Sequence, residues 1–331
     1  MFENDTSESF YLKTNSELTN VGVDNITLKD ERRNRELPVR VYYPQESGSF
    51  PVIIFSHGTG GSKESFSYLG KFWASCGYVC IHPTHFGSDF SLVQKIGLQA
   101  LLEITNQPES WLERPQDISF LIDSLSELEQ KIPALVGKIN QSFIGVSGHS
   151  YGAYTTMLLA GAVIEMPGNQ TASFGQDDRA WVFLPISPPG TGRLGLNDCS
   201  WDKIAAPMMS VSGSKDQGWE GEPPSWRREA FKYMRPGDKY HVLIKGANHF
   251  SFDPDVGTGR KPFQRINRIN QIAGRQNPQE LESKMLIKSY LKTASIAFWD
   301  AYLKFKKPAK EYLSSDTLTT SSNGDVTVLG K

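Results

Sequence analysis

A serine between two glycines, placed directly after a short apolar run, is the first feature of this sequence that can do chemistry. The stretch GVSGHSYGAY, residues 145–154, holds Gly148, Ser150 and Gly152 in the spacing G-x-S-x-G, and a helix-forming stretch follows. A chain that turns sharply from a strand into a helix strains its central residue and leaves room only for small neighbours. The pattern therefore predicts an exposed serine nucleophile near the positive end of a helix, rather than a small residue in a tight turn.

A serine hydroxyl is a poor nucleophile at neutral pH, so Ser150 needs a base and a group that orients the base. After a turn of this kind the partners follow along the chain as an acid and then a histidine, each behind a later strand. Asp216 ends the stretch PMMSVSGSKD, and His249 ends the stretch YHVLIKGANH. We expect His249 to take the proton of Ser150 as general base, and Asp216 to hold the histidine tautomer and stabilise the imidazolium.

The other five histidines are less well placed for the role of base. Three are interpreted as structural because they lie inside the serine turn, open a glycine turn or begin an apolar run: His149, His57 and His241. His82 and His85 occur in IHPTHFGSD with Asp89 nearby, a grouping that needs a third well-spaced ligand to hold a metal. We interpret them as loop residues beside the pocket, and we expect neither a metal nor a cofactor.

Acyl transfer also needs hydrogen-bond donors for the oxyanion that forms on the substrate. FSHGTGGSKES, residues 55–65, is a glycine-rich turn after the first central apolar run, where backbone amides can approach a ligand without obstruction. We expect the amides of Thr59 and Tyr151 to form the oxyanion hole. The loss of one such donor typically lowers the rate about 10²- to 10³-fold.

Short apolar runs alternate with helical stretches along the chain. Six of the runs are continuous, as in parallel strands that helices cover on both faces, and they occupy residues 51–58, 78–85, 142–150, 181–188, 207–216 and 240–249. The alternation predicts an α/β fold with a doubly wound, mostly parallel central sheet flanked by helices in a single domain. Residues 21–30 and 35–44 partly alternate, so we expect an antiparallel pair at the sheet edge.

The chain divides into a central domain and two end segments. We expect a flexible N-terminal segment at 1–20, the catalytic domain at 21–313 and a polar C-terminal tail at 314–331 that frays. Segments 86–113 and 188–206 follow the carboxyl ends of strands, where open α/β sheets bind ligands, so we interpret them as pocket or lid insertions. The stretch FSLVQKIGLQALL in the first of them fits either a lid helix over an acyl pocket or a core helix.

Three tryptophans follow strands that end near the predicted site. Trp219 lies in DQGWEGEPPSW, which also contains Trp226, and Trp201 ends LNDCSW. Each fits either an apolar pocket wall or ordinary packing near the start of a helix. Together with His85, they are the candidate substrate-pocket residues.

Composition and charge narrow the classes of partner. Lys plus Arg number 35 against 36 for Asp plus Glu, so the net charge of −1 favours neither nucleic acid nor an anionic membrane. Cys76, Cys80 and Cys199 fit neither a disulfide framework nor a zinc knuckle. The polar N-terminus and the lack of a long apolar run predict a soluble, cytoplasmic protein, although a mature secreted form would look the same. The oligomeric state stays open.

Several of these stretches together resemble the α/β-hydrolase superfamily over about residues 35–310, in the branch of platelet-activating-factor acetylhydrolases and dienelactone-hydrolase-like esterases. They are HGTGGSKESFSYLGKFWASCGYVCIHPTHFGSD, ERPQDISFLID, IGVSGHSYGAYTTMLLAGA and ASIAFWDAYLK. The resemblance implies a serine carboxylester hydrolase without metal or cofactor. Dienelactone hydrolases carry cysteine where this chain has Ser150. Some relatives place the acid after the run at 181–188, where Ser187 and Pro188 stand here; this favours Asp216 over Asp178 and Asp198.

The sequence therefore predicts hydrolysis of small or short-chain esters, acetyl or aromatic esters among them, through an acyl-enzyme. Lipase-type or phospholipid acetylhydrolase activity is an alternative in the same class. A serine peptidase or amidase would be expected to carry a propeller or an extended acyl-binding domain before the catalytic part, and none is seen in this sequence. A silent ligand-binding member would be expected to lack a residue of the triad, and none is missing.

Overall fold

The computed structural model describes residues 19–168, 170–173, 175–253 and 278–331. The N-terminal segment that we expected to be flexible lies outside the described residues, except for its last two positions. No helix in the described part of the chain is long and apolar enough to cross a membrane.

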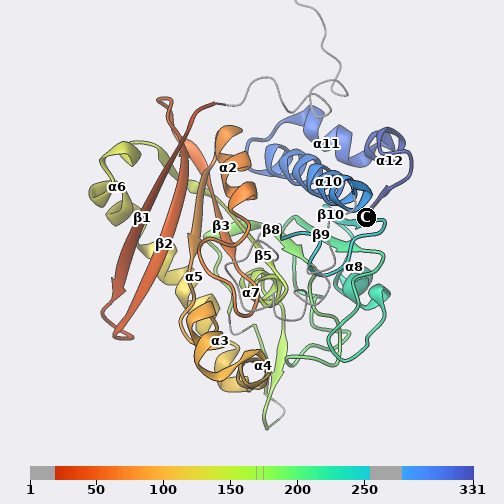
Figure 1. The fold of residues 1–331 in the computed structure, drawn as a ribbon, viewed down its shortest axis with the longest axis horizontal. Coiled ribbons are helices and arrows are strands. Elements are labelled where there is room, and N and C mark those ends of the chain that lie inside the picture. Colours follow the sequence, from red (N-terminus) through yellow and green to blue (C-terminus); the bar gives the residue numbers. More distant parts are fainter. Residues whose placement is uncertain (1–18, 169, 174, 254–277) are drawn as a thin grey trace, which may run out of the picture.

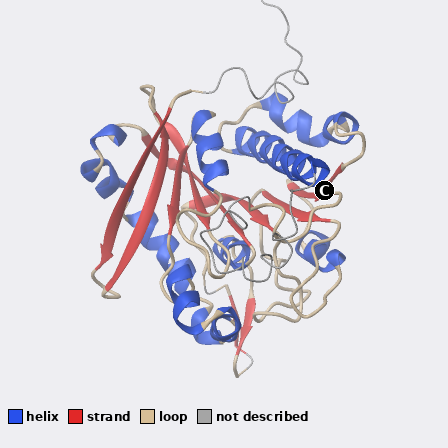
Figure 2. Ribbon diagram, viewed as in Figure 1, coloured by secondary structure: helices blue, strands red, loops and turns tan. Residues whose placement is uncertain are grey.

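A nine-stranded sheet forms the centre of the described structure (Figures 1 and 2). Its six middle strands, from β4 to β10, run parallel, and antiparallel strands close both edges. In order across the sheet the strands are β1 (Val21–Asp30), β2 (Arg35–Pro44), β4 (Val79–Pro83), β3 (Phe50–Ser56), β5 (Ile139–His149), β8 (Ala180–Ile186), β9 (Met208–Gly213), β10 (Lys239–Ile244) and β11 (Val326–Gly330). The predicted mostly parallel sheet and its antiparallel N-terminal pair are confirmed.

Helices cover both faces of the sheet, which is why most residues of its parallel strands are buried. Ile53 and Phe55 of β3 belong to one core cluster, and Val52 and Ile54 belong to the other. The first cluster includes side chains of α2 (Ser67–Ser75), α10 (Pro278–Tyr302) and α11 (Lys307–Ser314), and the second includes those of α5 (Glu113–Asp123), α6 (Leu125–Lys131), α7 (Tyr151–Leu159) and α8 (Glu229–Tyr233). Figure 1 shows α2 and α10 above the strands and α5 and α7 below them.

The predicted fraying tail at 314–331 is the main correction to the fold. Residues 317–321 form α12 (Thr317–Ser321), and β11 adds an antiparallel strand to β10, pairing Val326 with Ile244 and Gly330 with Tyr240. Leu318 and Val326 are buried against the first core cluster. These few apolar residues in a polar segment are enough because β10 would otherwise present an unpaired edge.

The segment 86–113 forms two short helices and a turn instead of a core helix: α3 (Phe90–Ile96), α4 (Leu98–Thr105) and η1 (Pro108–Ser110). Only Val93 of α3, and Leu101 and Thr105 of α4, are buried. The remaining short elements of the described residues are η2 (Pro133–Leu135), η3 (Pro224–Arg228) and the separate antiparallel pair β6 (Ile164–Met166) and β7 (Gln170–Ala172).

Candidate active site

Ser150 lies in the turn between β5 and α7, with backbone angles φ 58° and ψ −116°. A residue with a side chain rarely adopts a positive φ, so the surrounding structure must hold this conformation. A Cβ atom on Gly148 would lie 2.3 Å from the carbonyl oxygen of Gly152, and one on Gly152 would lie 1.9 Å from the carbonyl oxygen of Ser56. Both flanking glycines are therefore required by the close approach of the backbone.

The structure brings Ser150, Asp216 and His249 together from the carboxyl ends of three strands. His249 Nε2 lies 2.9 Å from Ser150 Oγ, and His249 Nδ1 lies 3.0 Å from Asp216 Oδ1. A carboxylate only accepts hydrogen bonds, so the Nδ1–H group donates to Asp216 and Nε2 is left to accept from the serine hydroxyl. This is the tautomer that a histidine general base needs.

Two residues that the sequence analysis did not select complete the surroundings of Asp216. Arg227 Nε donates to Oδ1 at 3.1 Å, and Ser187 Oγ donates to Oδ2 at 2.5 Å. The Arg227 guanidinium also donates to the carbonyl oxygens of Ser187 and Gln217. Some relatives carry the acid at the place that Ser187 occupies. Here Ser187 instead donates a hydrogen bond to Asp216, which follows the next strand of the sheet.

Opposing effects act on the pKa values of the acid and the base. Burial raises the pKa of Asp216, but the hydrogen bond from His249 and the charges of His249 and Arg227 outweigh it and lower the pKa to about 2. Burial lowers the pKa of His249, and the nearby charge of Arg227 lowers it further against the opposing effect of Asp216. Asp216 is therefore ionised and His249 is neutral at pH 7, as general-base catalysis requires.

His149 supports the base from behind. Its ring lies 4.6 Å from the ring of His249, centroid to centroid, and its Nε2 makes a 3.0 Å hydrogen bond to the backbone oxygen of His249. Burial holds the pKa of His149 well below its usual value. We therefore assign His149 a structural role, in line with its interpretation from the sequence.

Thr59 and Tyr151 both line the cavity that contains Ser150. Tyr151 is the first residue of α7, so its amide has no acceptor within the helix. Among the hydrogen bonds of the described residues, neither the Thr59 amide nor the Tyr151 amide donates to another protein group. Both amides are thus available to a ligand at Ser150.

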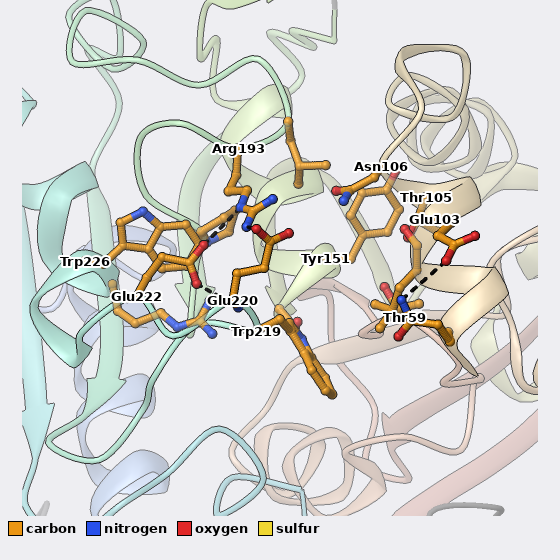
Figure 3. A pocket seen from close by; sticks show the side chains of 16 residues that line it. Thr59, Glu103, Thr105, Asn106, Tyr151, Arg193, Trp219, Glu220, Glu222 and Trp226 are labelled. Carbon is orange, nitrogen blue, oxygen red and sulfur yellow. Dashed lines mark hydrogen bonds and ion pairs between the residues drawn. The ribbon is translucent and has the colours of Figure 1, made fainter. Parts of the chain in front are cut away.

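Ser150 lies where two cavities meet. The larger, of about 290 Å³, is shown in Figure 3, with Trp219 and Trp226 on one side and α4 residues such as Glu103 on the other. Arg193 forms ion pairs there with Glu220 and Glu222. The smaller, of about 60 Å³, is lined by residues from 58–61 and 249–253 together with Leu98 and His149. Segments 86–113 and 188–206 both contribute to the larger cavity.

Two candidate pocket residues lie elsewhere. His85 is fully buried and contacts Ser56 and Asp117. Trp201 is also fully buried, and its indole N–H donates to the sulfur of Met157. Neither residue lines a cavity at Ser150. Both side chains lie in the interior of the protein instead.

The grouping of His82, His85 and Asp89 does not converge on one point. His82 Nδ1 is within hydrogen-bond distance of the Ser65 carbonyl, and its ring stacks on Phe55. Asp89 accepts from the backbone at the start of α3. No group of three or more potential metal ligands occurs among the described residues.

The family of the chain is given by a comparison with family models. The model described as Chlorophyllase matches residues 7–175, just over half of the chain. The chain belongs to the chlorophyllase family. The predicted resemblance to serine esterases of the α/β-hydrolase superfamily is therefore confirmed.

Three curated relatives match parts of the chain. Chlorophyllase-1, chloroplastic, of Citrus unshiu is 29% identical over 175 residues, covering 49% of this chain and 48% of that protein. Platelet-activating factor acetylhydrolase of Canis lupus familiaris is 22% identical over 289 residues, covering 78% and 58%. Cutinase est1 of Thermobifida alba is 26% identical over 213 residues, covering 64% and 57%. The chain thus spans about half to three-fifths of the length of these relatives.

A solved structure extends the likeness to the whole fold. The ferulic acid esterase from Streptomyces cinnamoneus superposes with a TM-score of 0.64 at 17% identity, covering 95% of this chain and 97% of that one. At this identity the likeness concerns the fold alone. It agrees with the nine-stranded sheet and its flanking helices.

Proposed function

We propose that this protein is a serine carboxylester hydrolase that acts through an acyl-enzyme. The observation that carries the proposal is the hydrogen-bonded chain from Ser150 through His249 to Asp216, with its serine on a strained turn where two cavities meet. The names of the relatives, which include a chlorophyllase, an acetylhydrolase and a cutinase, support the same reaction class.

The reaction proceeds in two halves. Ser150 Oγ forms a bond to the ester carbonyl carbon while its proton passes to His249 Nε2, and the amides of Thr59 and Tyr151 donate to the negative oxygen. The carbon–oxygen bond to the alcohol then breaks, and His249 returns the proton to the leaving oxygen. Water attacks the acyl-enzyme through the same steps, releasing the acid and restoring Ser150. Asp216 stays ionised and stabilises the imidazolium in both halves.

The two cavities give the ester a place for each of its halves. The larger holds the bulkier half between Trp219, Trp226 and Leu194, whose side chains suit an aromatic or short aliphatic group. The smaller has room for a group of acetyl size. We therefore propose small or short-chain esters as substrates.

Exposed apolar side chains favour a second candidate, hydrolysis of esters presented by a lipid aggregate. Three large apolar residues are at least two-fifths exposed on the elements that border the cavities: Ile104, Trp219 and Phe250. Such a cluster is typical of surfaces that bind apolar partners. Activity that rises sharply when a long-chain ester passes from monomers to aggregates would favour this candidate.

The test is hydrolysis of p-nitrophenyl esters from acetate to palmitate beside the matching p-nitroanilides, with mass spectrometry after treatment with a fluorophosphonate probe. We expect ester turnover that declines with chain length, little anilide turnover, and an adduct on Ser150. Ser142→Ala, at an exposed position of β5, is the control and should keep both turnover and adduct. No turnover and no adduct in the wild type would favour a silent binding protein instead.

A further inference from the structure

A buried guanidinium lies beneath the proposed oxyanion hole, and the reaction described above does not use it. Arg114 of α5 is 1% exposed. Its guanidinium donates to the carbonyl oxygen of His57, to that of Gly58 at 3.4 Å and to Ser88 Oγ at 2.9 Å. The two carbonyls belong to the residues immediately before Thr59. A charge is costly to bury unless its partners are in place, so these contacts form a built arrangement.

Residues 57–61, here called the oxyanion loop, have little intrinsic rigidity because three of the five are glycines. Three backbone hydrogen bonds shape the loop: the Gly60 amide donates to Ser88, the Gly61 amide donates to Gly58, and the Gly61 carbonyl accepts from the Phe90 amide. Arg114 contacts the same Ser88, through both its hydroxyl and its carbonyl oxygen. Arg114 thus links the oxyanion loop to Ser88, which already accepts a hydrogen bond from the loop.

The same guanidinium also contacts the second proposed donor residue. The central carbon of the Arg114 guanidinium lies 4.6 Å from the ring centroid of Tyr151, within the range of cation–π attraction. The Tyr151 hydroxyl in turn donates to the carbonyl oxygen of Ser110 at 2.9 Å. Arg114 therefore contacts both segments whose amides face the oxyanion, one through hydrogen bonds and the other through an aromatic ring.

A buried hydrogen-bond chain that includes Asp117 of the same helix also supports the loop. The His85 amide donates to His57 Nε2 at 3.0 Å, so Nδ1 carries the ring proton and donates it to the Gly58 carbonyl at 2.7 Å. The His85 ring bridges Ser56 Oγ and Asp117 Oδ2, each at 2.9 Å. Because Ser56, His85 and Asp117 are fully buried, they touch no substrate and serve to fix the loop.

We propose that Arg114 is a positioning residue: its guanidinium fixes the amides of Thr59 and Tyr151 relative to each other and so preforms the oxyanion hole. The inference rests on the proposed ester hydrolysis. Oxyanion donors act strongly only when they are held in place before the reaction, and a displacement of about 1 Å can cost 10²-fold in rate. Loosening the loop should therefore slow the chemical step while substrate binding changes little.

The experiment compares Arg114→Met and Arg114→Lys with Arg179→Met. Arg179 also makes several ion-pair contacts, with Asp123 and Asp177, but on the surface away from the cavities. For each protein, kcat and KM are measured on p-nitrophenyl acetate, with active enzyme counted by endpoint titration with the fluorophosphonate. The inhibition constant of a trifluoromethyl ketone, whose adduct on serine carries an oxyanion, is measured in parallel.

We expect Arg114→Met to lower the titrated kcat about 10- to 100-fold with KM within about twofold. The inhibition constant of the ketone should rise by a similar factor. Arg114→Lys keeps the charge but not the forked geometry, so its kcat and inhibition constant should lie between those of the wild type and Arg114→Met. Arg179→Met should keep the wild-type kcat and inhibition constant. In a further variant, Arg114→Ala, guanidinium chloride at millimolar concentration should partly restore kcat. Methylammonium chloride should not restore it.

A purely structural role for Arg114 would give a different pattern. The fraction of titratable enzyme and the melting temperature would fall, while kcat per active site and the inhibition constant would stay at wild-type values; this result overturns the proposal. If Arg114→Met does not fold, the same comparison on Arg114→Lys decides it. A wild-type protein without turnover and without an adduct on Ser150 would instead overturn the proposed function, and this inference with it.

Discussion

The molecule contains two serine–histidine–aspartate chains with the same order of hydrogen bonds. In the first, His249 joins Ser150 to Asp216, and in the second His85 joins Ser56 to Asp117. In both, Nδ1 of the histidine faces the carboxylate and Nε2 faces the serine hydroxyl. Ser150 lines both cavities, whereas Ser56, His85 and Asp117 line neither. The same order of three hydrogen-bonded side chains therefore occurs both at the proposed active site and inside the core.

The two serines differ in the backbone that carries them. Ser150 occupies a strained turn at the start of α7 and lines both cavities. Ser56 ends the regular strand β3 and is fully buried. Access and the nearby free amides, rather than the triad itself, distinguish a nucleophile from a structural hydroxyl.

The two carboxylates differ in the balance between burial and charge. At Asp216 the hydrogen bond and charge of His249, together with the charge of Arg227, outweigh burial, so the pKa falls to about 2. At Asp117 burial dominates, and the pKa is raised although Arg33 lies 2.8 Å away and Arg35 is nearby. Asp216 is thus the better partner for an imidazolium that forms during a reaction.

The largest expected difference between the two chains concerns the serines. Ser150→Ala removes the nucleophile and should lower kcat about 10⁴-fold or more while the protein stays folded. Ser56→Ala should lower kcat less than about tenfold and act mainly on the melting temperature, because it leaves His85 Nε2 buried without its donor. Activity of Ser150→Ala within a few-fold of wild type would refute the assignment of the nucleophile.

The aspartates should separate the chains nearly as well. Asp216→Asn would favour the wrong tautomer of His249 and should lower kcat about 10⁴-fold with little effect on KM. Asp117→Asn leaves Arg33 paired with Asp30 and Arg35 paired with Glu113, so it should act on stability through the buried hydrogen bond to His85 and lower the free energy of unfolding by about 1 to 3 kcal/mol, measured by urea unfolding. If Asp198→Asn rather than Asp216→Asn abolished turnover, the acid would be misassigned.

The first chain was predictable from the sequence because each member sits at a position that the fold dictates. Ser150 lies between glycines after a strand, and Asp216 and His249 follow two later strands in the required order. Backbone topology brings such positions together whatever the surrounding side chains are. The Thr59 and Tyr151 amides follow from the same geometry.

The second chain and the buried arginines were not predictable, because they depend on contacts between distant segments. Arg114 reaches the oxyanion loop from a helix 56 residues further along the chain. His85 was expected beside the pocket, but its side chain bonds to Asp117, and no sequence pattern pairs these two residues. Arg227 stands beside Arg228 in the sequence without any motif, and only the folded chain shows its contact with Asp216.

The base of the catalytic chain can be tested by its pH dependence. Because burial and Arg227 lower the pKa of His249, kcat/KM should stay constant around neutral pH and decline only on the acid side, as His249 is protonated. Arg227→Met removes the neighbouring positive charge and should move the midpoint of this decline to higher pH. Arg228→Met, one residue away and exposed, is the matched control. An unchanged midpoint in Arg227→Met would show that Arg227 does not tune the base.

The smallest expected effect, on acid stability, distinguishes the carboxylates by sign. Since the pKa of Asp216 is lowered to about 2, its ionised form stabilises the fold above its unfolded pKa, and roughly 2 kcal/mol is lost as pH falls from about 4 to 2. Asp117, with a raised pKa, acts oppositely and weakens the fold as it ionises. In urea unfolding between pH 5 and pH 2, Asp216→Asn should therefore flatten the acid dependence of the free energy of unfolding, and Asp117→Asn should steepen it. A flatter acid dependence in both variants would mean that the ionised Asp117 is stabilised as strongly as the ionised Asp216. The electrostatic contrast between the two chains would then not hold.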